Sequence, residues 1–171
     1  RAETFVTGIG EGAHAEVTSL CLLQDTQQAN IVNHTTFTAP NCTANIRNRN
    51  IVQDKAQAIF QGKFHVEQAA QKTDAYMLCQ NILLADTARA THKPELEIYA
   101  DDVKCSHGAT TGTLDEDHIF YLQARGIPKP VAINMLIAAH IEDLLAELND
   151  ELQAVVRPHA EHWLTETTSR D

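Results

Sequence analysis

The sequence predicts a mainly β protein that ends in a small helical part. Three observations support this fold class. Apolar and polar residues alternate up to about Leu114, as they do in strands that bury one face. Segments of this kind recur about every 14 or 15 residues, and the period then changes to that of helices. We therefore expect residues 1–114 to form stacked β-strands and residues 115–171 to form helices.

The repeat consists of short units, and a unit this short cannot bury its apolar face alone. Neighbouring units are therefore expected to share one continuous core. Two units of about 14 residues would make one coil of about 28, which favours a β-helix. Alternation alone also fits an antiparallel sandwich, and that alternative stays open here. The units begin at Ala15, Ala29, Ala44, Ala58, Ala75, Ala88 and Val103.

Polar and glycine-containing breaks are expected to form turns. Three such breaks are Gln61-Gly62, Asp86-Thr87 and Asp101-Asp102. The glycine cluster GIGEG, residues 8–12, is also expected to be a turn, because no strand–helix context for a phosphate-binding loop surrounds it.

Start and stop signals delimit the first helix. Thr113 and Glu116 have the spacing of a capping box, in which each side chain satisfies the other's backbone N–H. A helix over residues 115–125 would follow and end at Gly126. The residues that this helix would turn toward a core are Ile119, Phe120 and Leu122.

Two more helices are expected after a proline-containing hinge at residues 127–130. The first covers residues 130–152 and is apolar on most sides in its early part, so it should be sandwiched or meet a partner. The last runs from about Asp150 to Leu164 with a kink near Pro158. The polar tail, residues 165–171, is expected to be frayed.

Composition argues against several classes of partner. The net charge is −10, the isoelectric point is near 5.3, and the basic residues are scattered, which disfavours nucleic acid. No apolar run approaches 18 residues and no leader is evident, so no membrane partner is expected. The chain has no initiator Met, and we expect it to be part of a longer protein.

The four cysteines are expected to be free, buried thiols in a reducing compartment. No two of them form a CxxC pair, so a structural zinc site is disfavoured. A disulfide framework is also disfavoured in a chain this long with so few cysteines. They are Cys21, Cys42, Cys79 and Cys105.

The segment ADDVKCSHGATTG, from Ala100 to Gly112, carries the strongest chemical signal. Cys105 and His107 are two residues apart, so on one strand their side chains share a face. They could be a thiol nucleophile with its base, part of a metal site, or a buried thiol beside a hydrogen-bonded imidazole. The residues alone favour the last interpretation, and a metal site would need ligands from another segment or chain.

One further histidine pair has helical spacing. His159 and His162 lie three residues apart, a spacing that brings side chains to one face of a helix. Nothing else in the tail completes a metal site, so we expect a solvated pair.

The run from Asn81 to Ile127 resembles the SufB/SufD family of the SUF iron–sulfur assembly machinery. It contains KPELEIYADDVKCSHGAT and FYLQARGI, which are most like the C-terminal part of the SufD branch. The upstream segment GKFHVEQAAQKTDAYMLCQN is similar as well. The specific match covers roughly residues 58–127; before it the likeness lies in the strand repeat, and after it in the helix pattern.

The resemblance implies a right-handed parallel β-helix over residues 1–114 and a helical domain over residues 115–171. It implies a non-enzymatic scaffold subunit of iron–sulfur cluster assembly. A SufB-like chain would pair with the C-terminal end of the β-helix, and a SufC-like ATPase would bind the helical domain. It places the protein in the cytoplasm, or in the plastid stroma of a plant.

The resemblance also assigns site residues. His107, and more weakly Cys105, would lie at the SufB-like interface and help to hold a nascent cluster, with His107 a metal ligand only beside ligands of the partner chain. No cofactor is expected on this chain alone, although a transient iron–sulfur cluster is expected at that interface. The residues assigned to ATPase docking are Phe120, Tyr121, Arg125, Gly126 and Pro130.

Two alternatives accompany this hypothesis. Without a SufB-like partner, the exposed end strand would invite a two-fold homodimer of the chain. A different class of function is a β-helix enzyme or binding protein for an extended ligand such as a polysaccharide. Such a protein needs a row of carboxylates and aromatic residues, whereas this chain has five Phe, three Tyr and one Trp and no evident acidic ladder at the unit spacing.

Overall fold

The computed structural model describes residues 1–168. It divides into two compact units, Arg1–Gly112 and a second that starts at Thr113. The predicted boundary after residue 114 lies two residues beyond this division. The last three residues of the tail that was expected to be frayed, 169–171, lie outside the described residues.

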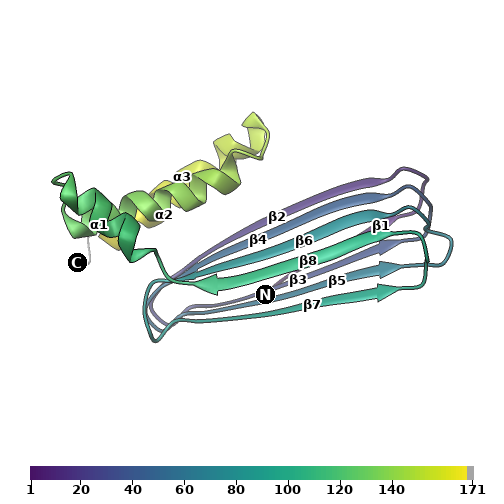
Figure 1. Cartoon of the computed structure of the whole chain (residues 1–171), viewed down its shortest axis with the longest axis horizontal. Coiled ribbons are helices and arrows are strands. Elements are labelled where there is room, and N and C mark those ends of the chain that lie inside the picture. The colour runs from purple at the N-terminus through teal and green to yellow at the C-terminus, as the bar shows by residue number, and fades with distance from the viewer. Residues whose placement is uncertain (169–171) are drawn as a thin grey trace. The chain divides into compact units, whose positions relative to one another are not determined.

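Parallel strands build the first unit. The strands β1, β3, β5 and β7 form one four-stranded sheet in that order, and β2, β4, β6 and β8 form another, as Figure 1 shows. The chain therefore crosses from one sheet to the other after each strand, and two successive strands make one coil. The bounds are β1 (Ala2–Gly8), β2 (His14–Leu23), β3 (Gln28–Phe37), β4 (Thr43–Val52), β5 (Gln57–Val66), β6 (Asp74–Leu83), β7 (Arg89–Ile98) and β8 (Lys104–Gly112).

Every strand pairing is parallel, which confirms the predicted β-helix and excludes the antiparallel sandwich. One coil takes from 29 residues, between Gln28 and Gln57, to 32 residues, between Gln57 and Arg89. This is slightly more than the expected 28. All seven predicted units are strands, whereas β1 was not predicted, because most of its residues are exposed and show no buried face.

Residues with left-handed backbone mark the corners of the coils. Asp25 and Asp54 have φ of 57° and 56° at one side, and Asn41 and Lys72 have φ of 60° and 61° at the other. A carboxylate oxygen of Asp54 accepts a hydrogen bond from the Asp25 backbone N–H at 2.9 Å. Asp25 and Asp54 thus occupy equivalent corners one coil apart. Their left-handed backbone and the hydrogen bond between them show that they form turns.

Most of the predicted turns are present. Residues 9–12 of the predicted turn at 8–12, together with Asp86-Thr87 and Asp101-Asp102, lie outside the strands, at the corners, whereas Gly8 is the last residue of β1. The turn expected at Gln61-Gly62 is wrong, because both residues lie inside β5. Gly62 is a buried position where the lack of a side chain serves packing.

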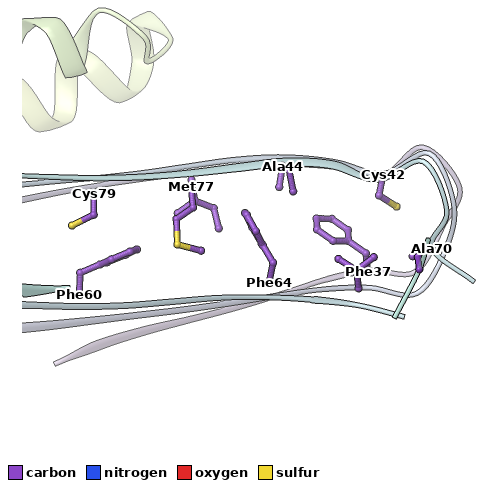
Figure 2. Close-up of a cluster of buried hydrophobic side chains, with 12 residues drawn as sticks. Phe37, Cys42, Ala44, Phe60, Phe64, Ala70, Met77 and Cys79 are labelled. Atoms are coloured by element: carbon purple, nitrogen blue, oxygen red, sulfur yellow. The ribbon is translucent and has the colours of Figure 1, made fainter. Parts of the chain in front are cut away.

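The core of this unit lies between the two sheets. Phe60 and Phe64 of β5 face Met77 and Cys79 of β6 in Figure 2. All four are at most 2% exposed. Small residues such as Ala44 face the rings, so the two sheets can approach closely. Full burial of one phenylalanine contributes roughly 2–3 kcal/mol to stability, so each of these rings is among the larger single contributions to the core.

The described residues of the second unit form three helices: α1 (Glu116–Ala124), α2 (Lys129–Leu145) and α3 (Asp150–Thr168). Gly126 has φ of 84° and ends α1, as predicted. The expected capping box is wrong. The cap is Asp115, whose carboxylate accepts from the Asp117 N–H at 2.8 Å, because the helix starts at Glu116 and Thr113 lies too far upstream.

The ends and faces of the helices differ from expectation in other respects. Phe120 is 72% exposed, whereas Ile119 alone is buried in α1. α2 ends at Leu145 and not near residue 152. α3 continues through Pro158 to Thr168, beyond the predicted end at Leu164. None of the described helices is long and apolar enough to cross a membrane.

Candidate functional site

The last coil of the β unit has no further coil stacked on its outer side within the described residues. Within the described residues, β7 pairs only with β5 and β8 only with β6, so each presents unpaired backbone groups and inward-facing side chains without a further coil above them. We call these inward positions the uncovered end. They are Ala90, His92, Pro94, Leu96 and Ile98 of β7, and Cys105, His107, Ala109 and Thr111 of β8.

Cys105 and His107 share the inner face, because they pair in register with the buried residues Ala75 and Met77. Cys105 is half-buried and packs against the core, whereas His107 is exposed. Burial raises the pKa of the Cys105 thiol above its ordinary value, against a smaller opposing effect of a hydrogen bond with the Ala75 backbone. A thiol with a raised pKa is a poor nucleophile at neutral pH, so the pair lacks the activation that covalent catalysis needs.

The other three thiols are buried, and all four cysteines are free, as expected. Burial raises the pKa of Cys21 and of Cys79 to about 11. Cys42 donates its S–H to the Ala39 carbonyl at 3.1 Å. Across the described part of the chain, no three His, Cys, Asp or Glu side chains are grouped so as to hold a metal ion. His107 and Cys105 are therefore at most part of such a site.

A row of buried polar side chains runs inside the β unit toward the uncovered end. The Asn50 amide donates to Asn48 Oδ1 and to Asn81 Oδ1, both at 2.7 Å. Asn81 in turn donates to Thr111 Oγ1 at 3.0 Å and lies 3.5 Å from the His92 ring nitrogen Nδ1. The row thus connects the middle coils to the last one.

Sequence reasoning did not single out His92. A signal was present, because His92 pairs in register with the buried Phe60 and belongs to the inner face by strand alternation. The alternation places it on a face, but only the coil topology puts that face at the same end as His107.

The outer face of the sheet that contains β5 and β7 carries a separate charged cluster. Glu97 contacts Lys63 Nζ at 2.5 Å and His65 Nδ1 at 3.0 Å, and it accepts from the Tyr99 hydroxyl at 3.0 Å. The Lys63 contact, then those of His65 and Tyr99, lower the pKa of Glu97 to about 2. This cluster faces away from the core and is not part of the uncovered end.

The helical residues with a predicted docking role are exposed. Phe120 and Tyr121 are 72% and 56% exposed. The Arg125 guanidinium lies 5.0 Å from the centre of the Tyr121 ring and donates to its hydroxyl at 2.9 Å, which orients both side chains. Gly126 ends α1, and Pro130 is exposed in the first turn of α2.

α2 adds two exposed apolar side chains, Val131 and Met135, each 46% exposed. Its other face buries Ile137 and Ile141. Solvent therefore contacts part of its apolar surface, so the helix is not sandwiched on all sides within the described residues, and a partner on this face stays a prediction. The histidine pair of α3 is exposed, and His162 Nε2 lies 3.3 Å from Glu166.

Comparisons with known proteins place this geometry in context. A family model described as "SUF system FeS cluster assembly, SufBD core domain" matches residues 1–140. The iron–sulfur cluster assembly protein SufD of Escherichia coli is 47% identical over 110 residues, which cover 64% of this chain and 26% of that protein. An iron–sulfur cluster assembly SufBD family protein of Synechocystis is 39% identical over 138 residues, 81% of this chain and 30% of that protein.

A plant protein is similar over a stretch of comparable length. The chloroplastic protein ABCI7 of Arabidopsis thaliana is 39% identical over 115 residues, which cover 67% of this chain and 24% of that protein. The chain therefore spans less than a third of the length of these relatives.

Proposed function

The chain belongs to the SufBD core family of the SUF system, and on that premise we propose that it is part of a non-catalytic scaffold subunit of iron–sulfur cluster assembly. The observation that carries the proposal is the match of the family model to residues 1–140, which include the whole β unit and its uncovered end.

The uncovered end is the proposed place of the nascent cluster, which is the cargo of the system. His107 is exposed there and Cys105 lies on the same face, so an imidazole and a thiol are available as borderline and soft ligands. Two such groups do not complete a coordination shell. A SufB-like partner chain would supply the remaining ligands and would pair with the free edges of β7 and β8.

The helical unit is the proposed docking site of a SufC-like ATPase. Exposed aromatic and aliphatic side chains on a small unit are typical of protein contacts, and Tyr and Arg are favoured at their centres. Phe120, Tyr121 and Arg125 on α1, with Val131 and Met135 on α2, supply these types. ATP hydrolysis by that partner would then drive rearrangement at the uncovered end.

We place the subunit in the cytoplasm, or in the stroma of a plastid. The four free thiols suit a reducing compartment. In the absence of a SufB-like chain, the same edge strands offer a two-fold homodimer as a competing assembly.

The cluster role is tested by His107→Ala in the full-length protein, with cluster assembly scored in cells. His14→Ala, an exposed histidine on β2, is the matched control. We expect a strong loss of assembly for His107→Ala alone. Normal assembly in that variant would assign His107 a structural role and overturn the proposed site.

The docking role is tested by co-purification with a SufC-like ATPase. Phe120→Asp should abolish capture of the ATPase, because a charge replaces an exposed ring at the contact. Leu152→Asp, at a residue 50% exposed on α3, is the control and should leave capture unchanged. Equal capture by both variants would remove α1 from the interface.

A further inference from the structure

The two free strand edges at the uncovered end differ in their backbone donors. In a parallel ladder, the N–H and C=O groups of alternate residues face the same neighbouring strand. The Arg89 N–H donates to the Ala56 carbonyl at 3.1 Å, and the Tyr99 N–H donates to the Val66 carbonyl at 2.8 Å. The register between β5 and β7 is constant along the strands. The odd-numbered residues of β7 therefore face β5, and the even-numbered residues face the free edge.

Pro94 is one of the even-numbered residues of β7. Proline has no backbone N–H, so the free edge of β7 lacks a donor in the middle of the strand, whereas the ladder between β5 and β7 loses none. Proline within a sheet is confined largely to positions of this kind, where no ladder donor is needed. A strand added beside β7 would therefore meet an interrupted ladder.

The free edge of β8 has no such interruption. The Lys104 N–H donates to the Thr73 carbonyl at 2.8 Å, and the register between β6 and β8 is constant, so the even-numbered residues of β8 face β6. The odd-numbered residues present their N–H and C=O groups to the free edge, and none of them is proline. These residues are Cys105, His107, Ala109 and Thr111.

The outward-facing side chains of the two strands differ in the same sense. Those of β7 include Lys93, Glu95 and Glu97, and charged side chains together with proline are typical of an edge that is protected against pairing. Beyond Lys104, the outward-facing positions of β8 are small and uncharged, so they leave room for a neighbouring strand. They are Ser106, Gly108, Thr110 and Gly112.

We propose that a partner chain adds a strand to β8 and not to β7, and that Pro94 closes the edge of β7 to pairing. This inference rests on the proposed function for the identity of the partner, a SufB-like chain, and it narrows the backbone pairing to one of the two edges. Side chains of β7 still line the uncovered end. The added strand runs directly beside His107, because the backbone N–H and C=O groups of that residue are among those that face the edge.

Hydrogen–deuterium exchange locates the pairing. In the protein alone, the amides of His107 and Ala109 should exchange faster than those of Ser106 and Gly108, because only the latter two donate to β6. In the full-length protein bound to a SufB-like chain, exchange of the β8 amides that face the edge should slow at least about tenfold, and that of the β7 amides should stay within about twofold.

Three results of this experiment would overturn the proposal. The opposite order of rates in the protein alone would show that the ladder groups are wrongly assigned. Equal slowing in β7 and β8 on binding would show that Pro94 does not close its edge. Slowing in β8 that depends on the concentration of the protein alone, and does not change with the SufB-like chain, would assign the edge to a second copy.

A proline on each edge tests the same point by capture of the SufB-like chain. Ala109→Pro removes a donor that faces the edge and places a ring in the path of the added strand, but it removes no donor from the ladder with β6. We expect capture by the full-length variant to fall at least about tenfold. Ala90→Pro is the matched control, because it is the same substitution at a half-buried position of β7 that also faces the edge. Capture by Ala90→Pro should stay within about twofold of wild type.

Wild-type capture by Ala109→Pro, or equal losses in Ala109→Pro and Ala90→Pro, would overturn the proposal. If Ala109→Pro does not fold, the exchange experiment decides, because it needs no variant. Failure of the wild-type protein to capture the SufB-like chain would reject the proposed function itself, whereas undiminished capture by every variant would reject this inference alone.

Discussion

Met77 fills the space that a side chain on Gly62 would occupy. The two residues lie in facing sheets, on β6 and β5, and Met77 is 1% exposed. A Cβ on Gly62 would overlap the Met77 sulfur and lie 2.7 Å from Met77 Cε and 2.9 Å from Phe60 Cε1. The glycine is therefore a packing residue in the middle of a strand.

Gly62→Ala should destabilise the β unit, because the added methyl group overpacks the core. We expect the free energy of unfolding to fall by about 1–3 kcal/mol. Urea unfolding of the chain measures this change, with Gly112→Ala as the control because a Cβ there meets nothing within 4 Å. The loss should shrink in a Met77→Ala background, and an unchanged loss in that background would contradict the packing explanation.

Glu97→Gln should lower stability in a pH-dependent manner. Lys63 first, then His65 and Tyr99, lower the pKa of Glu97 from 4.5 to about 2. A carboxyl with a lower pKa in the folded state stabilises the fold above its unfolded pKa, and this contribution is lost as the pH falls through the folded value. The stability difference from wild type should thus be largest above about pH 5 and vanish near pH 2.

Urea unfolding at several pH values measures that difference. Glu97 is partly exposed to solvent, so added salt should reduce the effect. Glu67→Gln, at an exposed position, serves as the control. A difference that grows on acidification would contradict the assignment of the contacts.

Asn50→Leu should disrupt the buried polar row. The substitution removes the donor shared by Asn48 Oδ1 and Asn81 Oδ1 and leaves both acceptors short of a partner. We expect the free energy of unfolding to fall by about 2 kcal/mol or more, the usual cost of unsatisfied buried groups. Ser106→Ala, at an exposed position of β8, should change it by less than about 0.5 kcal/mol. An equally small change for Asn50→Leu would show that the row contributes little to stability.

Thiol labelling should distinguish Cys105 from the other cysteines. Cys21, Cys42 and Cys79 are buried, whereas Cys105 is half-buried at the uncovered end. A thiol reagent at neutral pH should modify Cys105 alone in the folded chain, and more slowly than a free cysteine, because burial raises its pKa. All four should react in denaturant. Rapid labelling of a second thiol in the folded Cys105→Ser variant would contradict the described core.

Lys72→Gly should stabilise the β unit. Lys72 is exposed at a corner with φ of 61°, a conformation that is unfavourable for a residue with a Cβ. We expect a gain of about 0.5–1 kcal/mol in thermal or urea unfolding. Lys93→Gly, in the middle of β7, should have the opposite sign, because glycine weakens a strand. A loss of stability in Lys72→Gly would mean that the lysine side chain outweighs the backbone strain.

The local pattern of apolar and polar residues was sufficient to locate most of the strands. It was insufficient to assign single residues to a turn or to the core. Alternation located seven strands because each buries one face of a continuous core, but it missed β1, which is mostly exposed. It misplaced a turn at Gly62, since glycine in a sequence does not distinguish a corner from a crowded core position. The apolar pattern of the first helix also placed Phe120 in a core, although α1 buries only Ile119.

By itself, the sequence determined the class of fold, the shared face of Cys105 and His107, and the likeness to the SufB/SufD family, because all three depend on spacing along one strand or on a continuous run of residues. Only the tertiary structure decided that β7 and β8 end their sheets together and that His92 lies on the inner face of this last coil. It also decided that the buried Asn81 contacts both His92 and Thr111. These contacts join residues from different coils. The length of a coil, 29 to 32 residues, brings such residues into register, and it varies with the corners and not with the strand pattern.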